Sequence, residues 1–443
     1  MFTITSTRER VNCVGGLALV GEGFKRFGLG SSLAFREDGR RSDRVADCDV
    51  ATMMMGLQAQ GRNDFEDIEL FRDDPMFQTA LDLPTVLSCA SLRQRLGDLA
   101  KDPAAFAAIR KANLRFLSEA EFGRISTPFS SFIAVDADVS PFDNSKSSKE
   151  GVGRTYKGMD GYAPLFAYVG SEGWLLDLEL RPGVQHSQKG APEFFRGCVD
   201  KLRFLGILDQ CLFRLDSGHD AKDTIDVLRG KCDFIVKRNL RKEFREWWLQ
   251  HAKRLGTATS PREGKTVYTG TVEHLRPGND ETTSPVTAVF RVTVRTTDAK
   301  GQAFLMEQID VDTWWTSLGE SPETIIELYK AHGTSEQFHS ELKTDMDLER
   351  LPSGTFATNE LVLLLGMLAY NTLRFIDQAF LKNRQLMPIK KDVMRRRVAS
   401  VIRDVVFTGC KLVRHANRWF IKMWERNPWL PAFQAVYRNI AMG

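Results

Sequence analysis

Between residues 131 and 237 the sequence changes periodicity several times, and this order of elements constrains the fold more than any other feature. Apolar runs typical of β-strands come three times in succession. Amphipathic stretches typical of helices then separate two further strand-like runs. The predicted strands are Ser131–Val139, Tyr162–Val169, Trp174–Leu180, Gln210–Leu215 and Phe234–Lys237, and the predicted helices are Ala191–Leu205 and Ala221–Arg229. The order is therefore β-β-β-α-β-α-β.

This order is typical of an RNase H-like domain, in which a mixed sheet carries helices on both faces. Residues 1–40 are Gly-rich and look irregular. From residue 41 to about residue 124, apolar residues recur at three- and four-residue spacing, which predicts helices. After Lys237, a helix at Lys242–Arg254 and three alternating runs predict an inserted subdomain. Those runs are Thr266–Leu275, Val286–Arg295 and Gln302–Ile309.

The predicted fold class is therefore α/β: an RNase H-like mixed-sheet catalytic core with an inserted mainly-β subdomain, flanked by helical N- and C-terminal regions. The predicted regions are 1–128 (mainly helical, either in contact with DNA or a packed bundle with no DNA role), 129–237 (first part of the core), 238–310 (the insertion), 311–352 (second part of the core, with a third acid) and 353–443 (helical and basic).

Basic residues are concentrated near the end of the chain. The formal net charge of +4 over 443 residues neither demands nor excludes a nucleic-acid partner. Between residues 394 and 426, however, few acids oppose many lysines and arginines, which we expect on helical segments at 391–426. These cations, Arg396 and Arg414 among them, either contact DNA phosphates or form a solvated helix face.

Cysteine usage and hydropathy favour an intracellular protein. The 7 cysteines are scattered and form no CxxC pair or Cys/His cluster, so we expect reduced thiols. The longest apolar stretch, Leu361–Tyr370, is too short to span a bilayer, and no apolar signal segment opens the chain. We therefore expect a soluble, cytoplasmic protein with no membrane partner.

Two acids interrupt the first predicted strand. Asp136 and Asp138 follow an apolar run at the two-residue spacing that keeps side chains on one face of a strand. A carboxylate at the end of a buried strand carries a desolvation cost unless it is paired or binds a cation, which suggests a metal ligand or a general base. The alternative is a strand that ends in solvent, where the aspartates cap the turn at Ser140-Pro141.

Two further acids match these. Asp216 ends the strand Gln210–Leu215 directly before a glycine turn, and Glu336 lies on a predicted helix. Tyr329, His332, Glu336, His339 and Lys343 follow one another at three- and four-residue intervals, so they form one polar stripe. That stripe could also be a solvated helix face. Together, strand-end aspartates and a helix-borne glutamate are what two Mg²⁺ ions need for displacement at phosphorus.

These motifs resemble the bacterial insertion-sequence transposases of the DDE type, in the cut-and-paste branch with a Tyr-Arg-Glu-Lys signature. Tyr329, His332, Glu336 and Lys343 have the spacing of that signature, with His in place of Arg. The Arg-x-Asp-Ser-Gly motif of the family is matched by Arg214, Asp216, Ser217 and Gly218, and its Arg-Pro-Gly-x-x-His turn by Arg181, Pro182, Gly183 and His186. The resemblance covers most of the chain.

The resemblance implies an enzyme that uses Mg²⁺, with Mn²⁺ able to substitute, to nick transposon ends, form end hairpins and transfer strands. Its implied partners are double-stranded DNA, in the form of terminal inverted repeats and target DNA, and a second copy in a homodimer on DNA. It would be nucleoid-associated when bound. The implied metal ligands are Asp138, Asp216 and Glu336, and the candidate DNA contacts are Tyr329, His332, Lys343, Arg214, Trp315, Trp248, Arg396 and Arg414.

Several alternatives remain open at this point. Relatives follow the first catalytic aspartate with one residue and then Thr or Ser, which favours Asp138, with Asp136 as the alternative ligand. Relatives also stack a tryptophan of the insertion on a flipped base. Candidates for that role, each of which could equally be a core aromatic, are Trp247, Trp248, Trp314 and Trp315. The alternative functions are a DNA-binding protein that no longer cuts and an RNase H-like nuclease.

Overall fold

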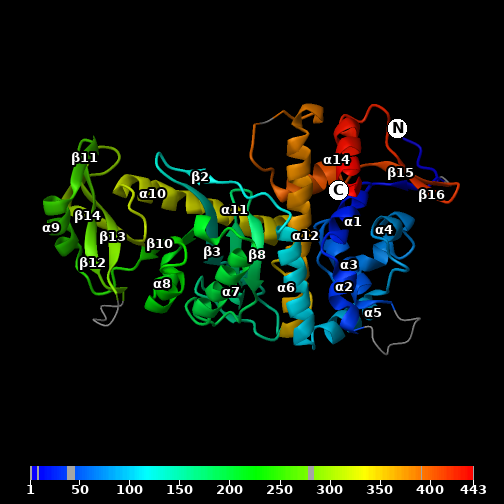
Figure 1. Cartoon of the computed structure of the whole chain (residues 1–443), viewed down its shortest axis with the longest axis horizontal. Helices are drawn as coiled ribbons and strands as arrows, with labels where there is room; N and C mark the ends of the chain where they lie inside the picture. The colour runs from blue at the N-terminus through cyan, green and yellow to red at the C-terminus, as the bar shows by residue number, and fades with distance from the viewer. Residues whose placement is uncertain (1, 7–8, 37–44, 278–283, 391, 443) are drawn as a thin grey trace.

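The computed structural model describes residues 2–6, 9–36, 45–277, 284–390 and 392–442. Its main feature is one long sheet, which extends from the left of Figure 1 to the centre of the molecule. The strands, in spatial order, are β11 (Thr257–Arg262), β12 (Lys265–Leu275), β13 (Val286–Thr297), β14 (Ala303–Thr316), β10 (Asp233–Arg238), β9 (Cys211–Leu215), β3 (Ser131–Val139), β7 (Leu165–Val169) and β8 (Trp174–Glu179).

The part of the sheet from β8 to β10 has the RNase H-like arrangement that the element order predicts. Strands β3, β9 and β10 are parallel, whereas β7 and β8 are antiparallel to their neighbours. Helices α7 (Ala191–Phe204) and α8 (Lys222–Leu228) connect β8 to β9 and β9 to β10. Because β3 lies in the middle of the sheet, it is buried along most of its length and reads as a continuous apolar run. The predicted fold class is confirmed.

The inserted strands continue this sheet rather than forming a sheet of their own. The end of β14 pairs antiparallel with β10, from Thr316 opposite Ile235 to Thr313 opposite Arg238. Helix α9 (Arg245–Leu255) covers β12, β13 and β14, with Trp248 packed on Phe290. The sequence pattern predicts β12 and β13 but ends β14 too early. It does not predict β11, because this exposed edge strand, TATSPR, has no large apolar residue.

The other large part of the molecule is built around α12 (Phe356–Lys382), which lies beside β8 (Figure 1). The helices packed against α12 include α1 (Leu17–Lys25), α3 (Asp47–Gln58), α5 (Cys89–Leu99) and α6 (Pro103–Leu117). By length and hydropathy α12 could cross a membrane, but 83% of that apolar window is buried inside the protein. This degree of burial is that of a core helix.

Both ends of the chain differ from the sequence-based expectation. Residues 1–40, expected to be irregular, include α1 and α2 (Leu29–Leu33), whose apolar residues join the core. The basic segment expected to be helical contains a hairpin, β15 (Cys410–His415) and β16 (Arg418–Lys422), and β1 (Val11–Asn12) pairs with β15. Exposed basic residues make up much of this hairpin, so its alternation carries little apolar signal.

Candidate active site

Asp138 and Asp216 lie side by side at the carboxyl ends of two parallel strands. In the register of β3 and β9, Ala137 pairs with Leu215, so an aspartate follows next on each strand. One ligand atom from each aspartate and one from His219 all lie within 4.8 Å of one another. The side chains of Asp138 and Asp216 are 25% and 40% exposed, so the cluster opens to solvent.

The electrostatics of this cluster fit a divalent cation. Burial, together with the neighbouring charge of Asp216, raises the pKa of Asp138 to about 7. Adjacent carboxylates repel one another when both are ionised, and a bound cation removes that repulsion. Carboxylate oxygens are also the hard donors that Mg²⁺ prefers. Asp138 and Asp216 could therefore hold the metal that the sequence predicts, although its identity does not follow from the acids alone.

The turn after β9 directs two side chains towards the cluster. Asp216 begins the short 3₁₀ helix η4 (Ser217–His219), and its Oδ1 accepts a hydrogen bond from the N–H of Gly218 at 3.1 Å. The approach is close, because a Cβ at position 218 would lie 3.0 Å from Asp216 Oδ1 and 3.1 Å from Ser187 Oγ, so a larger residue would require these side chains to shift. The same turn brings His219 Nε2 to 3.8 Å from Asp216 Oδ1.

His219 is a site residue that the sequence reasoning missed. It is 0% exposed and its ring packs edge-on against Phe195. Within the described part of the chain, neither ring nitrogen has a hydrogen-bond partner. Burial lowers the pKa of His219 to about 4, so the ring is neutral near pH 7. The available signal is its position three residues after Asp216, which one helical turn brings back towards the acid.

Asp136, the alternative ligand, is committed to other partners. It shares the face of Asp138 on β3 but is 3% exposed. Arg214 donates to both of its carboxylate oxygens, at 2.7 and 2.6 Å, and His332 Nδ1 lies 2.9 Å from Oδ1. Burial favours the neutral acid, but the charges of Arg214 and His332 lower the pKa of Asp136 overall. The geometry therefore leaves Asp138, and not Asp136, facing the cluster.

The same contacts place Arg214 and His332 inside the protein, although both were predicted to contact DNA. The guanidinium of Arg214 also donates to the carbonyl of Leu328 at 2.8 Å, on α10 (Pro322–Lys330). Burial disfavours the charged form of His332, but Asp136 raises the pKa of His332 above its usual value. These residues join β3, β9 and the end of α10 through a buried ion pair.

The predicted polar stripe is divided between buried and exposed positions. After α10 come a 3₁₀ turn, η6 (Ala331–Thr334), then α11 (Ser335–Ser340) and a π-helical turn, η7 (Glu341–Asp345). His339 is buried, with Nδ1 3.2 Å from the Tyr168 hydroxyl and Nε2 4.0 Å from Asp138 Oδ2. Tyr329 is half-buried, and burial and then the charges of Asp216 and Asp138 raise its pKa.

Glu336, the predicted third acid, does not join the cluster in this conformation. It is exposed on α11 and, among the described residues, makes no hydrogen bond or ion pair. The helical segment changes from 3₁₀ to α to π geometry within 15 residues, 331–345, so positions 332 and 339 are buried and 336 is not. The role of Glu336 as a metal ligand remains a prediction.

The other predicted DNA contacts are mostly inside the protein. Trp248 and Trp315 are buried, and their indole N–H groups donate to Glu243 and Asp220, each within 2.9 Å. Lys343 is half-buried and donates to the carbonyl of Pro141. Of the remaining candidates, Arg396 pairs with Asp377 and Trp314 is buried. Trp247 is 39% exposed, and Arg414 is exposed and lies over the Trp419 ring.

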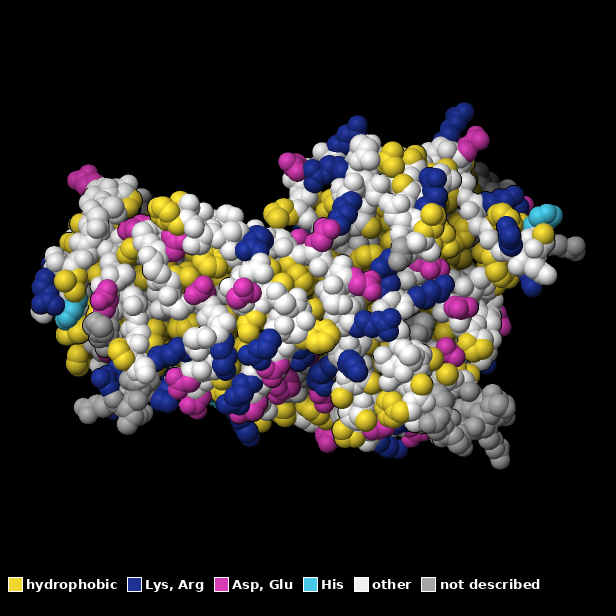
Figure 2. All heavy atoms as spheres, in the orientation of Figure 1, with side chains coloured by type: hydrophobic (Ala, Val, Ile, Leu, Met, Phe, Trp, Pro, Cys, Tyr) yellow, Lys and Arg dark blue, Asp and Glu magenta, His cyan; other side chains and the backbone are white. Residues whose placement is uncertain are grey.

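Surface charge on the face shown in Figure 2 is mixed. Lysine and arginine side chains alternate there with aspartate and glutamate instead of forming one continuous positive patch.

A cavity of about 580 Å³ between the inserted strands and α10 is lined by Arg291, Arg295, Asp310 and Asp312 among others, and Asp138 and Asp216 do not line it. The acids lie outside this cavity, at the carboxyl ends of two central strands, and are partly exposed to solvent. An open position of this kind suits a large substrate better than an enclosed small molecule.

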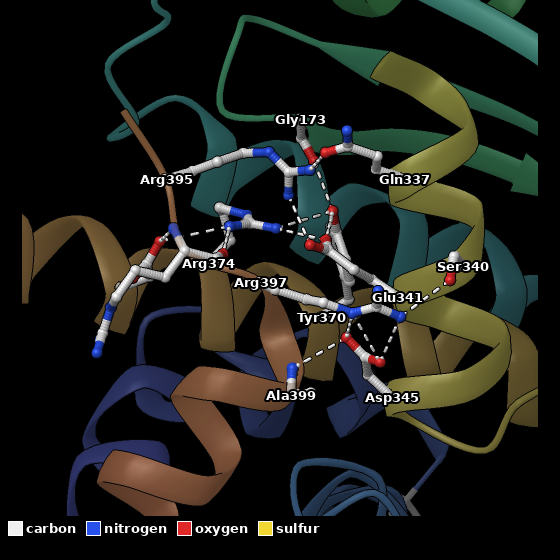
Figure 3. A network of polar contacts seen from close by, with 12 residues as sticks. Gly173, Gln337, Ser340, Glu341, Asp345, Tyr370, Arg374, Arg395, Arg397 and Ala399 are labelled. Carbon is white, nitrogen blue, oxygen red and sulfur yellow. Dashed lines mark hydrogen bonds and ion pairs between the residues drawn. The ribbon is translucent and has the colours of Figure 1, made fainter. Parts of the chain in front are cut away.

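A buried network fixes the segment that carries Glu336 to the helical part of the molecule (Figure 3). Glu341 is 1% exposed and accepts hydrogen bonds from Arg374 on α12 and from Arg395, both at 2.7 Å. Its Oε2 also accepts from the Tyr370 hydroxyl at 3.2 Å. One turn later Asp345 accepts from Arg397 Nε at 2.8 Å. Arg395 and Arg396 therefore serve as ion-pair partners of buried acids, as does Arg397, whose own side chain is 51% exposed.

Two comparisons with known proteins found similarities. The family model described as Transposase DDE domain group 1 matches residues 3–442. Among solved structures, the chain is similar to a piggyBac transposase in a synaptic complex with hairpin DNA, with 10% identity and a TM-score of 0.41 over 88% of this chain and 79% of that chain. No curated protein matches.

Proposed function

Because this chain belongs to the transposase family with a DDE domain of group 1, we propose that it binds the ends of a DNA element, hydrolyses phosphodiester bonds there and joins the freed 3′-hydroxyls to target DNA. The observation that carries the proposal is the pairing of Asp138 and Asp216 at the carboxyl edge of an RNase H-like sheet. Cut-and-paste movement through end hairpins, with an insertion sequence as the mobile element, is part of the same proposal.

The proposed cofactor is Mg²⁺, with Mn²⁺ able to replace it. Asp138 and Asp216 would hold it, and Glu336 would complete the site when DNA is bound. When bound, a divalent cation generates a nucleophile from water or a hydroxyl and stabilises charge at phosphorus. Asp138 and Asp216 provide oxygen donors on adjacent strands, and their partial exposure leaves room for a phosphate group.

The neighbouring residues hold these acids in place. Arg214 bonds to Asp136 on β3 and to the Leu328 carbonyl on α10, so it keeps the end of β3 in a fixed position relative to α10. Tyr329 is the residue of the Tyr-Arg-Glu-Lys spacing that we propose contacts a DNA phosphate beside the acids. A tyrosine hydroxyl is protonated at neutral pH and can donate a hydrogen bond to phosphate, and the raised pKa of Tyr329 extends this to higher pH.

The proposed partner is double-stranded DNA, first as terminal inverted repeats and then as target, bound by a homodimer that assembles on it. Exposed cations of the β15–β16 hairpin, such as Arg414, support this proposal because they are free to contact phosphates. We propose a cytoplasmic location, with association to the nucleoid when the protein is bound to DNA.

Cleavage of DNA carrying the ends of the element tests the function. The protein with Mg²⁺ or Mn²⁺ should nick such DNA and transfer the strand, and Asp216→Ala should reduce cleavage by at least about 10³-fold while DNA binding persists. Asp209→Ala is the matched control, because this exposed aspartate precedes the same strand at its opposite end. Equal cleavage by the parent and Asp216→Ala proteins would refute the assignment.

The same assay separates the alternative functions. Binding without cleavage by the parent protein would indicate a DNA-binding descendant of a transposase. Hydrolysis of DNA or RNA without strand transfer would indicate an RNase H-like nuclease. Membership of the family favours the transposase over both.

A further inference from the structure

The imidazole of His219 has an unusual environment for a buried histidine. A neutral imidazole has one N–H donor and one acceptor nitrogen, and a buried ring normally satisfies both. His219 is 0% exposed, yet neither nitrogen has a hydrogen-bond partner in the described part of the chain. Its Nε2 instead lies 3.8 Å from Asp216 Oδ1, at the cluster that contains Asp138.

Packing fixes the ring in this orientation. Phe195, on α7, contacts it edge-to-face with centroids 5.1 Å apart, and the η4 turn holds its backbone. Arg181, whose charge acts on His219, donates hydrogen bonds to Glu179 and to the Ser187 carbonyl. The ring is thus the buried member of a cluster whose two carboxylates are partly exposed.

We propose that His219 is a nitrogen ligand of the divalent cation held by Asp138 and Asp216, which makes this a mixed oxygen and nitrogen site. One imidazole nitrogen and two carboxylate oxygens, all within 4.8 Å of one another, form a donor set for one ion. The inference deepens the proposed function and rests on it only for the use of the cation in DNA cleavage. Cation binding itself can be measured without DNA.

This donor set predicts a preference among cations. Mg²⁺ takes oxygen donors and retains its waters, whereas Mn²⁺ and later transition metals accept imidazole nitrogen. We therefore expect the protein to bind Mn²⁺ at least about 10-fold more tightly than Mg²⁺, and His219→Gln to remove most of that preference. Asp216→Ala should weaken the binding of both cations.

Electron paramagnetic resonance of Mn²⁺ with the full-length protein is the test. Titration gives the affinity, competition with Mg²⁺ gives the preference, and the pulsed spectrum reports a coupled imidazole nitrogen. The expected result is a nitrogen coupling that changes in protein labelled with ¹⁵N-histidine and disappears in His219→Gln. His251→Gln, a histidine of α9 in the inserted region, is the control and should keep the coupling.

His339 is the competing nitrogen donor, because its Nε2 lies 4.0 Å from Asp138 Oδ2 and has no hydrogen-bond partner among the described residues. Loss of the coupling in His339→Gln, together with its retention in His219→Gln, would overturn the proposal. So would bound Mn²⁺ without histidine coupling in the parent protein, a result that needs no variant to fold. Nitrogen coupling without DNA cleavage would leave this inference standing and refute the proposed function.

Discussion

Ala137 on β3 and Leu215 on β9 are paired across parallel strands, and this pairing sets Asp138 beside Asp216. A shift of one residue in this register would move one aspartate to the opposite face of the sheet. The register is held by buried apolar residues on both strands and by the bond from Arg214 to Asp136, which are themselves paired residues. The site is therefore a direct consequence of how the central strands align.

The pH dependence of stability should report the burial of Asp138 and its repulsion by Asp216. Folding raises its pKa from 3.8 to about 7, so between these values the folded protein keeps a proton that the unfolded chain has released. The contribution of this retained proton to the free energy of unfolding is present at low pH and is lost as the pH rises towards 7. In metal-free protein, Asp138→Asn should raise Tm by about 3 °C at pH 8 and have a smaller effect at pH 5. Asp209→Asn is the control, and an equal gain in Tm for both variants would contradict the explanation.

Asp136→Asn should lower the stability of the protein, whereas Asp138→Asn should raise it. Asp136→Asn leaves Arg214 buried without its carboxylate, so we expect a loss of about 3–5 kcal/mol in the free energy of unfolding. Mn²⁺ affinity of the folded protein should change much less than in Asp138→Asn. Denaturant unfolding and cation titration of both variants provide the comparison. Loss of Mn²⁺ binding in Asp136→Asn with unchanged stability would make Asp136 the ligand.

Glu336 should matter for cleavage but not for cation binding in the absence of DNA. It is exposed and lies outside the cluster, so Glu336→Gln should leave Mn²⁺ affinity unchanged within about twofold. On DNA carrying the ends of the element, the same variant should lose at least about 10²-fold in cleavage rate if the helix supplies its carboxylate there. Full cleavage activity would remove Glu336 from the site.

The network around Glu341 should be a major source of stability. Arg374→Met removes one of the two cationic partners of Glu341 and the more distant partner of Asp377, so we expect a loss of about 1.5–3 kcal/mol in unfolding free energy. Arg403→Met, an exposed arginine beside Asp404, should change it by less than about 0.5 kcal/mol. Denaturant midpoints of the two variants measure the difference, which would vanish if the network were unimportant.

Salt dependence should distinguish surface arginines from internal ones. Arg414→Ala should reduce the slope of log K against log salt for DNA binding by about one, because this exposed residue is free to contact a phosphate. Arg396→Ala should lower stability instead, because its guanidinium is paired with Asp377. An unchanged slope in Arg414→Ala would exclude the hairpin from the DNA interface.

The core was accessible from sequence because its strands are buried and its helices amphipathic, so periodicity alone gives their order. Asp138 and Asp216 could be recognised for the same reason, as acids that end apolar runs. The partners of Asp136 could not, since Arg214 and His332 come from distant elements and their pairing depends on strand register. His219 was hidden because a lone histidine in a turn has no periodic signal.

The ends of the chain show a second reason for failure. The β15–β16 hairpin turns at Ala416-Asn417, where both residues have positive φ. The sequence Ala-Asn does not predict such a turn, because alanine rarely adopts positive φ. Its basic residues suggested a DNA-binding helix, whereas the cations nearby, such as Arg395 and Arg397, neutralise buried acids. Charge composition alone could not distinguish basic residues that bind phosphate at the surface from basic residues that neutralise buried acids.

The continuous pairing of β14 with β10 limits how the inserted region can move. A tethered module could swing on a flexible linker, but here backbone hydrogen bonds run without a break from β13 through β14 to β10 and then to β9. Within the described strands, the inserted region is therefore held by paired backbone to the strand that precedes Asp216. It cannot turn as a rigid body about β14 without breaking the hydrogen bonds between β14 and β10.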